Sequence, residues 1–420
     1  MRFYSSTLSI AKNKKKNHIQ IRAIHINHNI NLRSKEWTEH CKTICIQNQI
    51  PLIIENINLN CNINNNIEEQ LRIQRYNIIY KNLYDNEILL TGHHINDQCE
   101  TFILFLKRGS GPTGLSSMSF DTQFGNKNII RPFLNITKKK LELWAKSKKL
   151  KWIEDFSNHQ IDYDRNFIRN KMLPILEKRW PFFVKNCFRT TMICQKETKL
   201  LNYFLHKKIV NFIKYDESLD ISNFQHMKKD MCTALIRYWL TLKKIKIPSY
   251  KNIQNIYYQM IFCRNDANPK IIIKNHAIKR YKKVLYFIKI KPNIQNMLLF
   301  WHNKNKKLKL PNNLGYLIQN KNGIILPAPH TNELINIRFQ HEGRISILGR
   351  NHTRKIKKIW QEKNIPPWLR NQIPLLFYNH TFIAALGVFI VKVKNTNRNN
   401  WIVSWFNNLE IPQDYKFSFY

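Results

Sequence analysis

One segment of the chain concentrates the residue types that carry out acid–base and phosphate chemistry. It runs from Leu90 to Met118 and reads LTGHHINDQCETFILFLKRGSGPTGLSSM. Its beginning predicts a strand that ends at Thr91, a tight turn at Gly92 and a helix that begins near Asn96. Open α/β sheets bind ligands at the carboxyl ends of their parallel strands, so we expect these polar side chains to line a ligand site.

The start of this helix allows two interpretations. At helical spacing, His93 and Asp97 share a face and could act together on a substrate. Asp97 followed three residues later by Glu100 also imitates a capping box, in which case either acid could serve only the helix N-terminus. Capping does not explain the two adjacent histidines, His93 and His94, so the sequence predicts a functional site here.

A glycine-rich basic run closes the same helix. Gly109 is suited to the residue that ends it, where a left-handed backbone is common. Gly111 and Gly114 then extend a flexible loop that begins at Arg108. The backbone N–H groups of such a loop suit a phosphate or a ribose.

A second basic cluster consists of Arg165, Asn166 and Arg169, with Asp155 upstream. Arginines four residues apart on a helix form a fork that can bind a phosphate or a developing negative charge. The alternative interpretation is a solvated pair on the surface.

These residues need a scaffold, and the first part of the chain predicts an α/β fold with a Rossmann-like parallel sheet. Short β-branched runs alternate there with helical spacing. The expected strands are Ile19 to Ile26, Pro51 to Glu55 and Glu87 to Thr91. The expected helices are Arg33 to Asn48 and Ile67 to Leu83.

The pattern changes twice along the chain, which predicts three domains. We expect the parallel-sheet domain over residues 1–185, a helical middle domain over 186–300 and a small α/β domain over 301–420. Long helical segments such as Lys228 to Lys243 mark the middle domain. Short strands and turns, including Gly315 to Pro327, mark the last one.

The charge of the chain favours a polyanionic partner. It has 69 Lys and Arg against 27 Asp and Glu, a net charge of +42, with a sequence pI near 10.0. Such a field suits nucleic acid. Lys, Asn and Ile are abundant and Gly is scarce, so drift toward AT-rich codons is an alternative source of any single lysine. The charge therefore indicates the class of partner but not the contacts.

Cysteine usage and hydropathy indicate a cytoplasmic protein without a membrane partner. Eight cysteines include no CxxC pair, and Cys41 and Cys45 lie one helical turn apart, as in ordinary helix packing. We assign no metal site. The longest apolar stretch, Thr381 to Val393, is shorter than the roughly 20 residues of a membrane span and predicts a strand pair.

A short basic segment near the C-terminus could bind phosphates. We expect it to form one helix with its apolar residues toward a core, ending before Pro366-Pro367 and followed by Arg370. A solvated basic face is the alternative; phosphate contacts there would position an RNA without reading its sequence. The charged residues of this helix are Arg354, Lys355, Lys357 and Lys358.

The segment that begins HHINDQCETFILFLKRGSGPTGLSSM resembles the signature of the tRNA(Ile)-lysidine synthases, a family of PP-loop ATP pyrophosphatases. The resemblance continues in IHINH, EEQLRIQRY, RPFL, WIEDFSNHQIDYDRNFIRNKMLPIL and, from Gly349 to Phe389, GRNHTRKIKKIWQEKNIPPWLRNQIPLLFYNHTFIAALGVF. It spans nearly the whole chain and is weakest between about 195 and 330. The first and last blocks are highly specific.

The resemblance implies a two-step ligation. ATP adenylates the carbonyl oxygen of the wobble cytidine in the CAU anticodon of tRNA(Ile), and the ε-amine of free L-lysine then displaces AMP. The modified base pairs with adenine instead of guanine, which changes decoding from AUG to AUA. A pyrimidine carbonyl oxygen is a very poor leaving group, so adenylation by ATP, normally with Mg2+, is needed first. A homodimer is a possible assembly.

The resemblance also suggests roles for residues. Asp97 is the candidate for assisting the neutral lysine amine, since this chain has Asn96 where many relatives have a second acid. Arg165 would stabilise the adenylate, and His94 and Glu100 would position the nucleotide, the base or Asp97. The further candidates for nucleotide binding are His25, Arg108, Gly109 and Gly111, with His28 ranked beside His25. The candidates for tRNA binding are Arg72, Arg75, Arg169, Arg354, Lys355, Lys358 and Arg370; ion pairing within the fold is the alternative for Arg72 and Arg75.

The sequence departs from the family at its beginning. Relatives start with a strand and an SGG-x-DS loop that holds the ATP phosphates, and no such loop occurs here; Ser5 to Leu8 could match only its tail. The strand and the Mg2+-binding aspartate of that motif are thus expected to be missing. Either the start has been placed too far downstream, which we favour, or the gene has decayed.

Three other functions stay open from sequence alone. A non-catalytic tRNA-binding remnant of the same family is the chief alternative. A tRNA thiolase with the same ATP-pyrophosphatase core is another, although the lack of a CxxC pair counts against it. A merely basic, ribosome-associated protein rests on charge alone.

Overall fold

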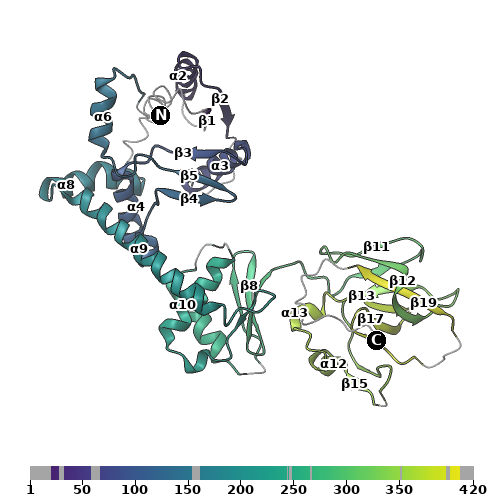
Figure 1. Cartoon of the computed structure of the whole chain (residues 1–420). Helices are drawn as coiled ribbons and strands as arrows, with labels where there is room; N and C mark the ends of the chain where they lie inside the picture. The colour runs from purple at the N-terminus through teal and green to yellow at the C-terminus, as the bar shows by residue number, and fades with distance from the viewer. Residues whose placement is uncertain are drawn as a thin grey trace. The chain divides into compact units, whose positions relative to one another are not determined.

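The computed structural model describes residues 20–27, 33–57, 67–153, 161–243, 245, 248–264, 267–350, 352–393 and 398–406. The chain divides into two compact units, Met1–Asn202 and Tyr203–Tyr420 (Figure 1). The three domain ranges expected from the sequence remain a prediction, because the division into units does not coincide with them.

Parallel strand pairing organises the first unit, as predicted. β1 (Ala23–Asn27) pairs in parallel with β2 (Leu52–Asn56), and β3 (Ile88–Leu90) pairs in parallel with β5 (Lys127–Ile130). The edge strand β4 (Asp121–Phe124) runs antiparallel to β5. The helices among these strands are α2 (Ser34–Gln47), α3 (Ile67–Asn82), α4 (Ile95–Lys107), α5 (Pro112–Leu115) and α6 (Lys138–Ser147).

The two parallel pairs share an apolar cluster but belong to separate sheets. Ile79, Leu89 and Ile129 are buried together, and Ile24 and Ile26 of β1 pack against them. Within the described part of the chain, no strand pairs with both β1 and β3. β3 therefore has an unpaired edge, and its outer side chains, Ile88 and Leu90, are exposed.

A helical layer fixes the position of α4. Ile95, Cys99 and Ile103 on one face of α4 pack against Ile168 and Leu173, and Val184 and Cys187 complete this cluster. Because that face is apolar at helical spacing, the opposite polar side of the helix N-terminus is turned toward the site. The elements of the layer are α7 (Asp164–Phe167), a π-helical turn (Ile168–Met172), α8 (Leu173–Arg179) and α9 (Phe183–Ile209).

The middle segment contains the expected helices and also a sheet. α10 (Lys229–Leu242) and α11 (Tyr250–Ile256), which continues into a π-helical turn (Tyr257–Ile261), pack in one core around the fully buried Trp239. The sequence analysis missed the four-stranded antiparallel sheet that shares this core, in the order β6-β9-β8-β7. Its strands are β6 (Leu219–Asp220), β7 (Lys270–Ile273), β8 (His276–Tyr281) and β9 (Val284–Lys289).

The last segment is built mainly from antiparallel strands. Its central sheet has the order β10-β13-β16-β17-β18, and a three-stranded sheet has the order β11-β12-β19. The Thr381 to Val393 stretch forms β17 and β18 with a turn between them, as predicted, whereas Tyr316 to Pro327 is one long irregular strand rather than short strands and turns. The strands are β10 (Leu298–Phe300), β11 (Leu308–Lys309), β12 (Tyr316–Pro327), β13 (Ile335–Arg338), β14 (Arg344–Ile345), β15 (Arg354–Lys355), β16 (Leu375–Tyr378), β17 (Thr381–Ala385), β18 (Phe389–Ile390) and β19 (Asn400–Phe406).

Two short helices complete this segment, α12 (Ile356–Glu362) and α13 (Pro367–Arg370). Ile356, Ile359 and Trp360 of α12 are buried in a cluster with residues of the central sheet. Within the described residues, no helix has the length and apolar character needed to span a membrane. The described cysteines are all free thiols.

Candidate active site

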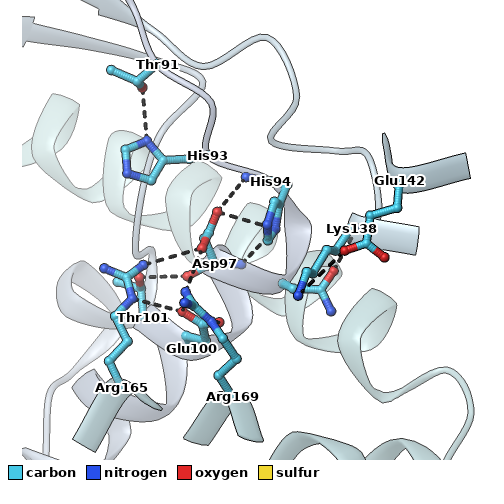
Figure 2. Close-up of polar contacts among 11 residues, drawn as sticks. Thr91, His93, His94, Asp97, Glu100, Thr101, Lys138, Glu142, Arg165 and Arg169 are labelled. Carbon is cyan, nitrogen blue, oxygen red and sulfur yellow. Dashed lines mark hydrogen bonds and ion pairs between the residues drawn. The ribbon is translucent and has the colours of Figure 1, made fainter. Parts of the chain in front are cut away.

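The N-terminus of α4 is closed by a reciprocal capping pair. His94 is the N-cap: its Nδ1 accepts a hydrogen bond from the backbone N–H of Asp97 at 3.3 Å, and its own backbone N–H donates to Asp97 Oδ2 at 2.9 Å. Figure 2 shows both contacts. The capping pair is thus His94 with Asp97, one turn earlier than the Asp97 and Glu100 pair considered from the sequence. Asp97 caps the helix and is held in one orientation by doing so.

Glu100 anchors the two arginines of the second cluster instead of capping. Its side chain is 1% exposed and accepts from Arg165 Nε at 2.8 Å, from Arg169 Nε at 2.7 Å and from Arg169 Nη2 at 2.8 Å. Arg169 Nη2 also donates to Asp97 Oδ1 at 3.3 Å, and Arg165 Nη2 lies 3.7 Å from the same oxygen (Figure 2). The two arginines therefore form a fixed fork beside two carboxylates, not a solvated pair.

The charges around Asp97 keep it ionised. Burial by itself raises the pKa of this carboxyl, but His94, through its charge and its backbone N–H, and Arg165 lower it further than burial raises it. The net effect is a pKa below the usual range of an aspartic acid. Asp97 is accordingly a carboxylate at neutral pH.

His93, beside this pair, is neutral at pH 7. Burial lowers its pKa to about 4, and Arg131, Arg165 and Arg75 lower it as well, while Asp97 opposes them. The ring is oriented by a hydrogen bond between Nδ1 and Thr91 Oγ1 at 2.9 Å. The imidazole can therefore donate or accept a hydrogen bond without adding charge to the site.

A buried glutamine that the sequence analysis did not single out holds the loop after α5. Gln98 is fully buried, and its carboxamide pairs with both backbone groups of Met118, donating to the carbonyl at 2.7 Å and accepting from the N–H at 3.0 Å. Gln195 of α9 donates to the Ser116 and Met118 carbonyls at 2.8 and 2.9 Å. One signal could have found Gln98: it is a polar residue on the apolar face of α4.

The glycine loop has the backbone conformation expected of it. Arg108 is the C-cap of α4, and Gly109 follows with φ +64°, the left-handed conformation that favours glycine. Gly111 is the N-cap of α5. At Gly114, an added Cβ would lie 2.5 Å from Ser110 Cβ, so the turn depends on the missing side chain. Arg108, Gly109 and Gly111 are exposed and accessible to a ligand.

Asn96, the residue before Asp97, has a structural role. Its side-chain oxygen accepts a hydrogen bond from the backbone N–H of Lys138, the first residue of α6, at 3.0 Å. Asn96 thus links the N-termini of α4 and α6, which leaves Asp97 as the carboxylate at the start of α4.

His25 lies on β1, packed against α2. Its Nε2 is 3.1 Å from Thr38 Oγ1 and its Nδ1 is 3.3 Å from Cys41 Sγ. The structure therefore gives this ring two partners within the fold. His28 and Asp155 lie outside the described residues.

The arginines of α3 differ in exposure. Arg72 is exposed and Arg75 is half-buried, and both guanidinium groups lie over the ring of Tyr76, at 5.9 and 5.6 Å from its centre. Arg75 is close enough to Arg165 for the two charges to repel. The structure thus brings Arg75 to the α4 site, whereas Arg72 faces solvent.

The basic C-terminal segment forms a strand and a helix rather than one helix. Arg354 and Lys355 make up β15, which pairs with β14, and α12 begins only at Ile356. The expectation that all four charges share a helix was wrong because Lys355 is the N-cap. Lys357 and Lys358 are exposed on α12.

Glu362, at the end of α12, forms ion pairs with two arginines of this segment. It pairs with Arg354 and, at 2.5 Å, with Arg350. Arg370 on α13 is half-buried: its Nε donates to the Ile365 carbonyl at 3.0 Å, and its pKa is lowered by burial and raised by Tyr281 of β8. Arg354 and Arg370 thus have contacts within the fold, while Lys358 projects into solvent.

No described residues form a group of three or more His, Cys, Asp or Glu side chains that could hold a metal ion. The two buried carboxylates of the site, Asp97 and Glu100, are instead paired with arginines. The described residues therefore do not fit a Mg2+ site of their own.

The first part of the chain, with parallel strands that lead into a polar helix N-terminus and arginines gathered beside it, belongs to the class of PP-loop domains, as comparison with family models shows. The model of the PP-loop domain matches residues 5–176. The model of the TilS substrate binding domain matches residues 219–286, and that of the TilS substrate C-terminal domain matches residues 335–405.

Curated relatives extend the likeness over nearly the whole chain. A tRNA(Ile)-lysidine synthase from Buchnera aphidicola subsp. Acyrthosiphon pisum (strain APS) is 68% identical over 97% of this chain and 92% of its own length. The enzyme of that name from B. aphidicola subsp. Schizaphis graminum (strain Sg) is 60% identical over 97% and 93%. That from Serratia proteamaculans (strain 568) is 36% identical over 92% and 89%. This chain belongs to the tRNA(Ile)-lysidine synthase family.

Proposed function

We propose that this chain ligates lysine to the wobble cytidine of an isoleucine tRNA, with ATP as the activating substrate. The observation that carries the proposal is the fixed network of Asp97, Glu100, Arg165 and Arg169 at the start of α4. It lies in a chain that matches the family's PP-loop, substrate-binding and C-terminal models. A non-catalytic remnant is not favoured, because the PP-loop match covers residues 5–176 and the 68% identical relative is named as a synthase.

The first step forms an adenylate. The carbonyl oxygen of the cytosine attacks the α-phosphorus of ATP, the bond to pyrophosphate breaks, and pyrophosphate leaves. Negative charge builds up on the phosphate oxygens during this step. Arg165 is already oriented by Glu100 at 2.8 Å, so it can stabilise that charge without reorganising, which is where fixed charges are most effective.

The second step forms the carbon–nitrogen bond. The lysine ε-amine attacks the ring carbon that carries the adenylate, and AMP leaves with the former carbonyl oxygen. Nitrogen becomes far more acidic as it bonds to the electron-poor ring, and Asp97, an oriented carboxylate, accepts the proton it releases. The lowered pKa makes Asp97 a weak base toward free lysine, so its role belongs to this later stage.

Nucleotide binding involves the glycine loop in this proposal. Arg108, Gly109 and Gly111 are exposed beside α4, and His94 contributes by orienting Asp97. In the same proposal His25, on β1, lies on the side of the site that binds the adenosine of ATP. Members of the PP-loop class commonly use ATP with Mg2+; because the described residues form no metal group, no step here is assigned to a protein-bound ion.

The tRNA is bound by basic residues of both units. Lys358 and Lys355 are exposed near α12, and Arg72 is exposed on α3. Arg75, Arg169, Arg354 and Arg370 also contact other parts of the protein, so any tRNA contact they make is shared with a structural role. The substrates place the reaction in the cytoplasm, and a homodimer is a prediction that sedimentation can test.

The test is incorporation of labelled lysine into a tRNA(Ile) transcript with a CAU anticodon, with ATP and the full chain. Asp97→Asn keeps a hydrogen-bond acceptor for the cap but removes the proton acceptor, so we expect roughly a 100-fold or greater loss of the ligation rate. The affinity for tRNA should be unchanged. Asp164→Asn is the matched control, because Asp164 forms an exposed ion pair with Lys107 on the same unit. Full activity of Asp97→Asn would remove Asp97 from the chemistry.

A further inference from the structure

Beside the α4 network, two arginines share one tyrosine, because Arg75 and Arg131 both interact with Tyr76. Arg131 follows β5 and is 7% exposed; its Nη1 donates to the Ser119 carbonyl at 2.7 Å and to Thr122 Oγ1 at 2.8 Å. Its Nε is buried and has no hydrogen-bond partner among the described residues. Arg75, half-buried on α3, lies with its guanidinium over the Tyr76 ring.

Within the described residues, no carboxylate forms an ion pair with Arg75 or Arg131. Asp97 and Glu100, the two buried acids of the site, are paired with Arg165 and Arg169. A buried charge without a partner is costly, and the positions that tolerate one are commonly ligand sites.

The pKa values of both guanidinium groups are lowered, as expected for cations that lack a counter-ion among the described residues. Burial lowers the pKa of Arg131, and Tyr76 opposes that effect. Burial lowers the pKa of Arg75 too, Tyr76 again opposes it, and repulsion from Arg72 and Arg165 adds to the lowering. An anion bound at these two arginines would offset their positive charge.

His93 connects the two arginines to the proposed chemistry. Its imidazole is influenced both by Asp97 and by the charges of Arg131 and Arg75. The two arginines therefore lie near the carboxylate that is proposed to meet the reacting amine. Because His93 is neutral at pH 7, it leaves the positive charge of the two arginines in place for a ligand.

We propose that Arg75 and Arg131 form an oxyanion subsite that binds the α-carboxylate of the amino-acid substrate. The inference rests on the proposed function and deepens it, since it assigns how the enzyme distinguishes an amino acid from a plain amine. Guanidinium groups match the planar carboxylate and form paired, charge-assisted hydrogen bonds with it. A phosphate group of the nucleotide presents the same chemistry, and the experiment separates the two sources.

The experiment compares lysine with 1,5-diaminopentane, which is lysine without its carboxylate, in the ligation assay with the full chain. Wild-type enzyme should prefer lysine strongly. Arg131→Met should raise the KM for lysine roughly 10- to 100-fold, the effect of losing a charge-assisted hydrogen bond. It should leave the KM for ATP and the weak use of the diamine unchanged, and Arg131→Lys should recover part of the loss.

A second variant and a control show whether misfolding, instead of the lost guanidinium group, causes a change in KM. Arg75→Met removes the half-buried partner and should raise the KM for lysine in the same way. Lys81→Met removes an exposed cation from the same helix and should change neither KM. If the KM for ATP rises while that for lysine stays constant, the subsite binds a nucleotide phosphate and the carboxylate assignment is overturned.

Wild-type protein alone supplies an independent measurement. Lysine methyl ester keeps both amines but has no carboxylate charge, so it should compete with labelled lysine as weakly as the diamine does. Competition as strong as that of lysine itself contradicts the subsite. Absence of any lysine incorporation by the wild type is a different result, because it rejects the proposed function rather than the subsite.

Discussion

The molecule contains the same ionic motif twice, in two very different settings. In the first unit, Glu100 receives Arg165 and Arg169; in the second, Glu362 receives Arg350 and Arg354. The Glu100 side chain is 1% exposed and that of Glu362 is 29% exposed. The arginines differ as well, at 24% and 28% exposed in the first motif against 41% and 51% in the second.

The difference shows what burial adds to an ion pair. On the surface, water and salt weaken the attraction and can replace either partner. In the buried motif the carboxylate has little access to water. The two arginines therefore donate the hydrogen bonds that water would otherwise donate, and they also neutralise its charge. That arrangement fixes Arg165 in one orientation, which is what a group must have in order to stabilise charge during a reaction.

The largest expected effect comes from removing the shared carboxylate of the buried motif. Glu100→Gln leaves two partly buried guanidinium groups without their counter-ion, and we expect a loss of about 2–3 kcal/mol in the free energy of unfolding. The estimate lies below the range for fully buried pairs because the arginines retain contact with water. Urea denaturation at neutral pH measures it.

The matched control is Glu362→Gln, which removes the carboxylate from the surface motif. Its midpoint of urea denaturation should be the same as that of the wild type within error. Equal losses in both variants would show that burial does not distinguish the two motifs, and the comparison drawn here would fail.

A smaller effect is expected from pH, through the buried histidine beside the first motif. The pKa of His93 is about 4 in the folded protein, whereas an unfolded histidine has a pKa near 6.5. Between these values the unfolded chain binds more protons, so this contribution to stability is complete above about pH 6.5 and is lost as the pH falls toward 4. We expect about 1–2 kcal/mol less stability at pH 5 than at pH 7 from His93 alone.

The measurement is the difference between wild type and His93→Asn in urea denaturation at pH 7 and pH 5. Asparagine can keep a hydrogen bond to Thr91 but does not titrate. The variant should lose less stability than the wild type on acidification. His352→Asn, at an exposed histidine, should show the wild-type dependence; a parallel response of all three proteins would contradict the burial of an uncharged His93.

Local patterns in the sequence predicted the helices on which the candidate site residues lie. The start of α4 and the i, i+4 spacing of Arg165 and Arg169 depend on residues that are close along the chain, so periodicity could place them. Their meeting with Glu100, 65 and 69 residues away, was not predicted, because spacing gives no sign of a contact between segments so far apart.

What the sequence did not predict depends on contacts between distant segments. Gln98 meets Met118 and Thr191, 20 and 93 residues along the chain, and helical periodicity gives no sign of either partner. The sheet that contains β8 and β9 escaped notice because neither strand alternates cleanly: β9 is a continuous apolar run and Lys279 and Arg280 interrupt β8. Arg354 was placed in a helix because it lies just before the helical spacing of Ile356, Ile359 and Trp360, but pairing of β15 with β14 prevails there.

The smallest expected effect concerns tRNA binding at the surface motif. Lys358 is exposed on α12 and projects into solvent, close in sequence to Glu362. Lys358→Ala should weaken tRNA binding roughly two- to fivefold and reduce the slope of log affinity against log salt by about one, since a single phosphate contact releases about one counter-ion. Filter binding at several salt concentrations measures both quantities.

The control for this prediction must separate a contact from the general field of a chain with a net charge of +42. Lys306→Ala removes an equally exposed cation from another part of the same unit. If the two variants lose affinity equally, the overall positive charge accounts for binding and Lys358 makes no specific contact with the tRNA. If only Lys358→Ala changes the salt slope, the surface motif marks a tRNA contact even though its ion pairs add nothing to stability.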